Sequence, residues 1–211
     1  MIGLHSAVVV DNKDPEGLNR VQVEFPQIDD KAPKSSWCRV ASPMAGKDRG
    51  WVMLPEVGAE VVIGFVGQSS TPIVIGSLYN GKDEKPPYAN KDGKNNLRLI
   101  WTRSDHQLVF DDTSGKESIG IGAKASKVGD ASSGGVHQIM DDSKKMFAQK
   151  SDGDLEMEAS GSVKITCSDF KVKAKGKLTI EATATAKVAG ASTTVEGKSK
   201  VGLVAAQVTL G

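Results

Sequence analysis

The stretch VKITCSDFKVKAKGKLTIEATATAKVAG, residues 163–190, decides how the second half of this chain can fold. Apolar and polar side chains alternate along it almost without a break, which is the pattern of a β-strand with one buried face. The apolar positions carry mostly small residues, and no turn pair such as Asn-Gly folds the run back on itself. A long, narrow, alanine-rich stripe therefore has to be buried by something other than a hairpin of its own.

The stripe extends beyond this stretch and changes parity once. The change falls at Ser168, and such a slip predicts a bulge or kink between two strand segments. Alanine makes a helix an alternative for EATATAKVAGA, but threonines at period two favour a strand. Corners are predicted at Gly161, Gly176, Gly190 and Gly197. The stripe consists of Leu155, Met157, Ala159, Gly161, Val163, Ile165 and Cys167, then Phe170, Val172, Ala174, Gly176, Leu178, Ile180, Ala182, Ala184, Ala186, Val188 and Gly190.

A stripe this narrow can be buried if three copies of the chain wind around one axis, because each inward residue then meets its two symmetry mates. Small residues suit the tight space near the axis, and strands paired between chains leave no open edge. We therefore predict an intertwined trimeric β-helix whose free subunit is unstable. A monomeric single-chain β-solenoid is the alternative. The residues predicted to line the trimer axis are Val163, Ile165, Val172, Ala174, Leu178, Ile180, Ala182, Ala184, Ala186 and Val188.

The opposite face of the stripe is polar and begins with a row of lysines. Lys171, Lys173, Lys175 and Lys177 share this face and are followed by Thr179. We expect a solvated face, on which lysines also discourage edge-to-edge pairing.

Residues 1–80 have the pattern of a compact β domain. SAVVVDN, NRVQVEFPQ, WCRVAS, GWVMLPEVGAEVVIGFVG and TPIVIGSLYNG predict about five short strands, which is typical of a small barrel or sandwich. The bulky aromatic residues Trp37, Trp51, Phe65 and Tyr79 concentrate here and are expected in its core.

The remaining segments connect this domain to the stripe. Residues 81–96 are charged and rich in Pro, Gly and Asn, which indicates a linker. Residues 97–150 are expected to hold strands and a loop: LRLIW, HQLVFDD and ESIGIGA are predicted strands and DTSGK a turn. IMDDSKKMFAQK is predicted as a short helix or a poorly paired strand. Residues 151–211 form the predicted β-helix.

Composition excludes several classes of protein. The 211 residues carry a net charge of +1, which argues against a strongly basic nucleic-acid binder. Cys38 and Cys167 are far apart and predict free thiols, as suits assembly in a reducing bacterial cytoplasm. We expect no Sec signal peptide at the N-terminus, and no segment approaches the roughly 20 apolar residues of a membrane helix.

No catalytic, metal or cofactor site is predicted. His5, His106 and His137 are scattered without metal-ligand spacing, and His106 is interpreted as a solvated histidine at a strand end. The acidic pairs Asp111-Asp112 and Asp141-Asp142 are interpreted as turn and surface residues rather than as an acid–base pair. We therefore expect that the protein is not an enzyme.

Several segments of the sequence resemble those of one known family. WCRVASPMAG, GWVMLPEVGAEVVIGFV, PIVIGSLYNG and PPY resemble the OB-fold segment of VgrG-type spike proteins and phage baseplate assembly protein V. GLNRVQVEFPQ upstream and NLRLIWTRSDHQLVFDDTSGKESIGI downstream extend the resemblance over about residues 3–123. It implies an all-β protein, in which an OB-fold collar precedes the trimeric triple-stranded β-helix.

The resemblance implies the homotrimeric central spike of a contractile injection machine. Such a machine is a phage tail, a tailocin, an extracellular injection particle or a type VI secretion system, delivered outside the cell to puncture a target membrane. Implied partners are a hub at the collar end and a PAAR-type tip protein docked on Val208, Thr209, Leu210 and Gly211. No hub domain precedes the collar here, so we expect a separate hub protein or a shortened chain.

One alternative function comes from a different class. OB folds also bind single-stranded nucleic acid through exposed aromatics on a basic groove. Lys47, Arg49 and Lys82 are too few for a convincing phosphate track, and the aromatic residues are expected in the core. The nucleic-acid-binding module with a β-rich tail is therefore the weaker hypothesis.

Overall fold

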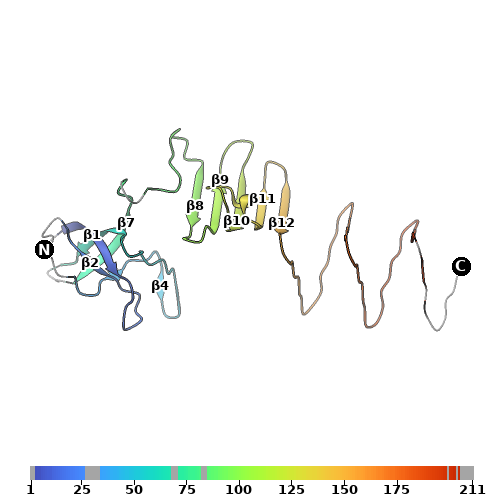
Figure 1. Ribbon diagram of the computed structural model, residues 1–211, viewed down its shortest axis with the longest axis horizontal. Coiled ribbons are helices and arrows are strands. Elements are labelled where there is room, and N and C mark those ends of the chain that lie inside the picture. Colours follow the sequence, from blue (N-terminus) through green and yellow to red (C-terminus); the bar gives the residue numbers. More distant parts are fainter. Residues whose placement is uncertain are drawn as a thin grey trace. The chain divides into compact units, whose positions relative to one another are not determined.

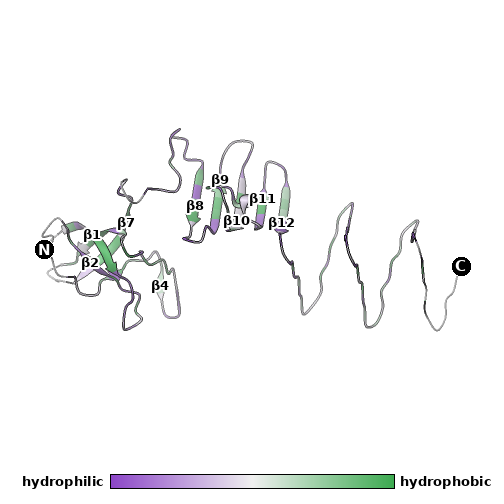
Figure 2. Ribbon diagram, viewed as in Figure 1, coloured by the Kyte–Doolittle hydropathy of each residue, from purple (hydrophilic) through white to green (hydrophobic). Residues whose placement is uncertain are grey.

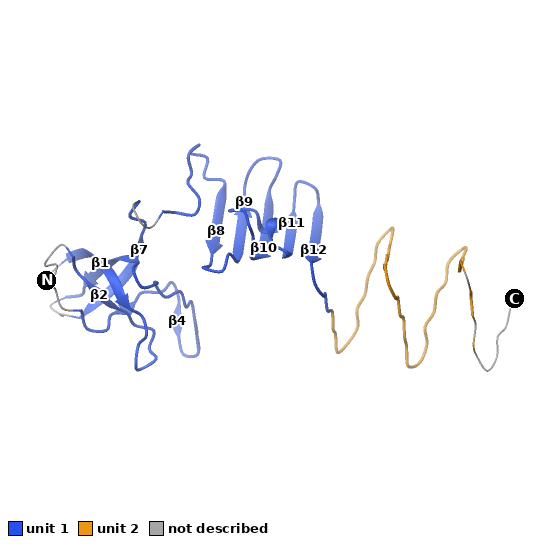
Figure 3. Cartoon of the chain, in the orientation of Figure 1, with its two compact units in different colours: residues 1–156 blue, residues 157–211 orange. Residues whose placement is uncertain are grey.

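The computed structural model describes residues 3–26, 34–67, 71–81, 85–198, 200–202 and 204. In these residues the regular structure is all β apart from one 3-10 turn, η1 (Ala131–Ser133) (Figure 1). The chain divides into two units, residues 1–156 and 157–211 (Figure 3). The division into collar, linker, connecting strands and needle drawn from the sequence stays a prediction.

The N-terminal strands form one sheet that curls on itself. β1 (Gly3–Asp11), β2 (Gln22–Glu24), β3 (Arg39–Val40), β6 (Glu60–Phe65) and β7 (Pro72–Leu78) lie in the order β2-β1-β6-β7-β3. β3 and β7 are parallel, and the other pairs are antiparallel. A bridge between Val21 and Cys38, with N···O distances of 3.0 and 2.7 Å, joins the two ends of this order. The five strands thus enclose a small barrel.

Alternating aliphatic residues fill the barrel. Val21 and Val23 are fully buried and Phe25 is nearly so, as the pattern of NRVQVEFPQ predicts. Figure 2 shows hydrophobic colour along β1 and β7, while β2 is pale. The core consists of Ala7, Val9, Val21, Val23, Phe25, Cys38, Val61, Ile63 and Val74.

The expectation of an aromatic core is wrong in two of four cases. Trp51 is 55% exposed and Tyr79 is 66% exposed, whereas Trp37 and Phe65 are half-buried. The β-branched residues already fill the barrel, and Trp51 follows the small hairpin of β4 (Ala45–Gly46) and β5 (Arg49–Gly50), outside the main sheet.

The second sheet is a simple meander. β8 (Leu97–Trp101), β9 (Gln107–Asp111), β10 (Ser118–Ala123), β11 (Val136–Asp141) and β12 (Met146–Ser151) pair antiparallel in chain order. LRLIW, HQLVFDD and ESIGIGA form strands as predicted. The helix alternative for IMDDSKKMFAQK is wrong, because residues 139–141 and 146–150 belong to the paired strands β11 and β12, and residues 142–145 form the turn between them.

A loop covers one face of this sheet. η1 packs against β10 so closely that a Cβ at Gly122 would lie 2.2 Å from the carbonyl oxygen of Ala131. Gln107 is buried beneath the loop, where its Nε2 donates to the Lys127 carbonyl at 2.9 Å and its Oε1 accepts from the Gly129 N–H at 3.0 Å. The loop therefore gives the sheet a small covered side and leaves the other side open.

From Asp152 onward, every described residue is exposed. The chain runs back and forth in extended segments that are separated by bends (Figure 1), and none of its described residues forms a strand or a helix. The bends fall at residues 152–153, 160–161, 168, 175–176, 183–184, 191–192 and 198. Gly161 and Gly176 lie at bends, as the sequence predicts, while Gly190 and Gly197 each directly precede one.

The spacing of the bends explains the change of parity. GDLEMEAS (153–160), GSVKITCS (161–168) and GKLTIEAT (176–183) share one eight-residue pattern, and bends separate them. The intervening segment DFKVKAK (169–175) is one residue shorter. Because side chains alternate with period two, one missing residue moves the apolar set to the other parity, as observed after Ser168.

Candidate functional site

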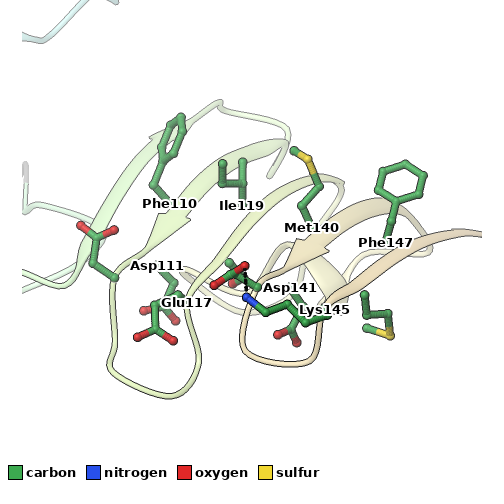
Figure 4. Close-up of a pocket in the computed structure, with 12 residues that line it drawn as sticks. Phe110, Asp111, Glu117, Ile119, Met140, Asp141, Lys145 and Phe147 are labelled. Carbon is green, nitrogen blue, oxygen red and sulfur yellow. Dashed lines mark hydrogen bonds and ion pairs between the residues drawn. The ribbon is translucent and has the colours of Figure 1, made fainter.

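The open face of the second sheet carries a continuous apolar row. By strand register Phe110 pairs with Ile119, Ile119 with Met140, and Met140 with Phe147. Figure 4 shows these four side chains standing on the same side of the sheet. They are 37–60% exposed and line a hollow of about 540 Å³. A contiguous apolar patch of this kind marks a surface that another molecule covers.

A second group of apolar residues on this face leads toward the extended chain. Ile121 and Val136 are 55% and 53% exposed and lie beside Leu155 in one shallow hollow. Leu155 is the first residue of the apolar stripe and has the parity of Phe147. In the sequence, the apolar positions of the open face and those of the stripe thus follow one alternating pattern.

The residues predicted to line the trimer axis are not buried by this chain. Val163 is 60% exposed, Ile180 is 77% and Val188 is 82%, and the alanines between them are exposed too. Full burial of one large aliphatic side chain is worth about 1.5–3 kcal/mol. Leaving the whole row in water thus forgoes on the order of 10 kcal/mol, so the segment lacks an interior of its own.

The residues predicted to dock a tip protein, Val208, Thr209, Leu210 and Gly211, lie outside the described residues.

The two acidic pairs lie where β9 and β11 end and their turns begin. The interpretation as surface residues holds for Asp112 and Asp142, which are exposed, but not for Asp141, which is buried. At the β9 end, Asp111 Oδ1 accepts from the Thr113 N–H at 2.8 Å. At the β11 end, Asp141 Oδ1 accepts from the Lys144 N–H at 3.0 Å. In each pair the N–H of the second aspartate donates at 2.9 Å to the carbonyl of the residue that directly precedes the neighbouring strand, Asn96 before β8 or Glu117 before β10. The acids thus fix these turns, and they also line the hollow beside the apolar row.

Asp141 is the more strongly held of these acids. Lys144 Nζ lies 2.7 Å from its Oδ2, and the hydroxyl of Ser143 donates to its Oδ1 at 2.6 Å. These bonds, with Lys144 contributing most, lower the pKa of Asp141 to about 2. Its side chain is only 10% exposed.

A comparable pair stabilises the loop between β1 and β2. Arg20 donates to both oxygens of Asp14, at 2.8 and 2.7 Å, and its guanidinium also lies 2.9 Å from Glu16. The bond from Arg20 holds the pKa of Asp14 far below its usual range, and the same bond raises the pKa of Arg20. Burial raises the pKa of the Cys38 thiol in the barrel.

The barrel also has an exposed apolar patch that sequence reasoning missed. Met44, Trp51, Val52 and Met53 surround the small hairpin and are 55–72% exposed, and Leu18 lines the same hollow. In WVML (residues 51–54) the apolar residues are consecutive instead of alternating. Such a run has no polar side to face water, and this was the signal in the sequence that could have predicted an apolar surface here. We call these five residues the collar patch.

The structure keeps the three histidines apart, in β1, before β9 and in β11. His106 is exposed at the start of β9, as predicted, and its Nδ1 accepts from the Lys124 N–H at 3.3 Å. Within the described ranges, no three His, Cys, Asp or Glu side chains gather as a metal site would require. Among the same residues there is no helix with the length and apolar character to span a membrane.

Comparison with known proteins identifies the barrel. Residues 5–79 match the family model of the type VI secretion system/phage-baseplate injector OB domain. This match confirms that the barrel is an OB domain, and it confirms the resemblance to spike and baseplate proteins.

Three similar relatives extend the match beyond the barrel. The type VI secretion system spike protein VgrG3 of Vibrio cholerae is 34% identical over 114 residues, which are 49% of this chain and 11% of that protein. The actin cross-linking toxin VgrG1 of Vibrio cholerae is 30% identical over 115 residues, 50% of this chain and 10% of the toxin. The spike protein VgrG5 of Pseudomonas aeruginosa is 34% identical over 118 residues, 50% of this chain and 14% of that protein. The chain thus matches only a small part of each relative.

Proposed function

We propose that this chain is the structural central spike of a contractile injection machine, with the OB barrel as collar and residues 151–211 as the shaft of a membrane-puncturing needle. One observation carries the proposal: the apolar stripe from Leu155 onward is exposed throughout its described length. A sequence with a regular apolar face and no interior needs partners to form one. The matches to the injector OB domain and to spike proteins support the collar assignment.

The partners that suit the stripe are two further copies of the same chain. The bends divide the stripe into extended segments of seven or eight residues. If three chains wind around one axis, corresponding segments can pair across chains and satisfy the backbone groups that a single chain leaves open. Alanines such as Ala182 and Ala184 then fill the narrow centre, where a larger side chain would clash.

The open face of the second sheet joins the same assembly. The apolar row of this face ends at Phe147, which has the same odd-numbered parity as Leu155 at the start of the stripe. One interface would therefore continue from the sheet to the shaft. Neighbouring copies would cover the row where the three chains approach each other above the shaft. We expect the collar patch to be covered at the opposite end, by a hub protein or a neighbouring collar.

The role we infer is mechanical rather than catalytic. Contraction of a sheath would drive the spike forward, and a closed, fully paired β shaft supplies the stiffness that this work needs. Asp111 and Asp141 each accept a backbone N–H bond within a turn, and we infer that they act within the fold. The relative that is named a toxin matches this chain over only 10% of its length, and its name by itself assigns no activity to the shared part.

We further propose that a PAAR-type tip protein docks on Val208, Thr209, Leu210 and Gly211, the last residues of the shaft. Deletion of residues 204–211 is expected to abolish capture of the tip protein in a pull-down while the trimer remains. Undiminished capture by the shortened chain would contradict this docking site.

Sedimentation equilibrium of the intact chain at micromolar concentration tests the main proposal. We expect a particle with three times the mass of one chain, and we expect the shaft to resist proteolysis only in that particle. A stable, well-folded monomer with a protected shaft would overturn the proposal and favour a single-chain solenoid.

A further inference from the structure

The charges on the polar side of the extended chain are segregated by segment. In segment 153–160 the first three polar-side positions are acids, and in segment 169–175 three consecutive lysines follow Asp169 on the polar side. Soluble surfaces ordinarily mix the two signs, so such separation within one repeating pattern requires an explanation. The acids are Asp154, Glu156 and Glu158, and the lysines, which we call the lysine band, are Lys171, Lys173 and Lys175.

The lysine band lies on an extended stretch between the bends at 168 and 175–176. Alternate residues of an extended chain are about 6–7 Å apart, which is within the Debye length of about 8 Å at physiological salt. The ammonium groups therefore repel one another. In the part of the chain that the structure describes, none of these lysines forms an ion pair. Asp169, two residues before Lys171 on the same side, offsets part of the repulsion, whereas Lys177 adds a fourth positive charge just after the bend.

Burial of the stripe would fix the direction of these charges. Val172 and Ala174 have the opposite parity to the lysine band, so an assembly that buries them turns all three lysines outward. Three copies would then present a positive girdle at one level of the shaft. This step rests on the function proposed above.

We propose that the lysine band binds the anionic phospholipid surface of a membrane. Lysine carries a compact point charge that suits phosphate-bearing headgroups, and each lysine near an anionic surface adds to the attraction. The outward positions from Asp169 to Lys177 hold neither an aromatic residue nor an arginine, so the band lacks the stacking groups that single-stranded nucleic acid needs. The girdle would hold the shaft at the headgroup layer as the needle meets the bilayer.

Co-sedimentation of the intact trimer with vesicles tests the proposal. Vesicles of phosphatidylglycerol should carry the protein down at low salt, and vesicles of phosphatidylcholine should not. The triple variant Lys171→Gln, Lys173→Gln and Lys175→Gln should lose at least tenfold in affinity for the anionic vesicles. The matched control removes the same charge elsewhere in the shaft, through Lys187→Gln, Lys198→Gln and Lys200→Gln, and should lose less than threefold.

Each outcome separates this inference from the proposed function. Before any vesicle is added, analytical sedimentation establishes whether the unaltered chain and both triple variants are trimers. A failure of the unaltered chain to assemble counts against the proposed spike and not against the lysine band. Equal losses in the two triple variants would show attraction by net charge alone and would overturn the lysine band. Absence of binding to anionic vesicles, or preferential binding to single-stranded DNA in competition, would also overturn it.

Discussion

The OB barrel and the shaft use the same alternating pattern with opposite results. In the barrel, β1 and β6 place Val9 and Ile63 inside a closed sheet, and both are at most 1% exposed. In the shaft, Ile180 and Val188 have the same alternation and are 77% and 82% exposed. Alternation therefore specifies which side of a strand is apolar, while the size of the residues and the presence of turns decide whether one chain can cover that side.

This difference separates two kinds of stability. The barrel closes through strand pairs within one chain and one bridge between Val21 and Cys38, so its folding requires only one chain. The shaft has no such closure in its described residues, and under the function proposed above its stability would depend on the concentration of other copies. The predictions below test this contrast, from the largest expected effect to the smallest.

Overpacking the shaft should have the largest effect. Ala182→Trp places a large ring where three chains are proposed to meet, and we expect the trimer to be lost while the circular dichroism of the barrel is kept. Thr179→Trp, on the polar face, is the matched control and should assemble normally. A normal yield of trimer from the alanine variant would show that this parity does not face an axis.

A cavity in the barrel should act on the single chain. Ile63→Ala removes a fully buried side chain and should lower the free energy of unfolding by about 2–5 kcal/mol in urea titrations. Val66→Ala changes a residue that is 63% exposed and should stay within about 0.5 kcal/mol. If both changes have equal effects, the barrel does not supply its own core.

The covered face of the second sheet should tolerate no added methyl group. Gly122→Ala forces a Cβ against the Ala131 carbonyl and should cost about 1–3 kcal/mol by overpacking, with faster proteolysis of residues 124–135. Gly76→Ala in β7 is the control, because nothing lies within 4 Å of its added Cβ. Unchanged proteolysis of the loop in the Gly122 variant would contradict the close packing of η1.

The smallest effect is expected from a turn and depends on pH. The folded-state pKa of Asp141 is about 2, below the ordinary value of 3.8, so its contribution to stability is complete above about pH 4 and is lost as the pH falls toward 2. Asp141→Asn should therefore lower the melting temperature at pH 6, and the difference from the unaltered protein should shrink as the pH falls through 2. A difference that persists undiminished at pH 2 would assign the effect to packing instead of charge. Asp142→Asn, at an exposed ion pair, is the control.

The alternating pattern predicted much of the fold. NRVQVEFPQ, LRLIW, HQLVFDD and ESIGIGA form strands because each alternates apolar and polar residues between clear turn signals. The OB domain followed from the ordered phrases around WCRVASPMAG and GWVMLPEVGAEVVIGFV. The slip of parity at Ser168 also predicted a bend.

Other features depend on contacts that periodicity does not encode. The covered face of the second sheet arises because Gly120 and Gly122 admit a loop, and ESIGIGA alternates glycine with isoleucine without saying which side is filled. Trp51 was expected in the core because aromatics are usually buried, yet the barrel is too small to admit it. The trimer-axis residues are exposed in one chain, so their proposed burial depends on further copies. The sequence of one chain does not state how many copies assemble.

The even spacing of the bends makes the length of the shaft adjustable. An insertion or deletion of eight residues leaves every later side chain on its original side, whereas a change of seven reverses all of them, as segment 169–175 already does once. Duplication of a unit such as GSVKITCS would therefore add one extended segment and leave the apolar and polar sides of the chain unchanged. The length of the proposed shaft can thus change in whole segments of eight residues.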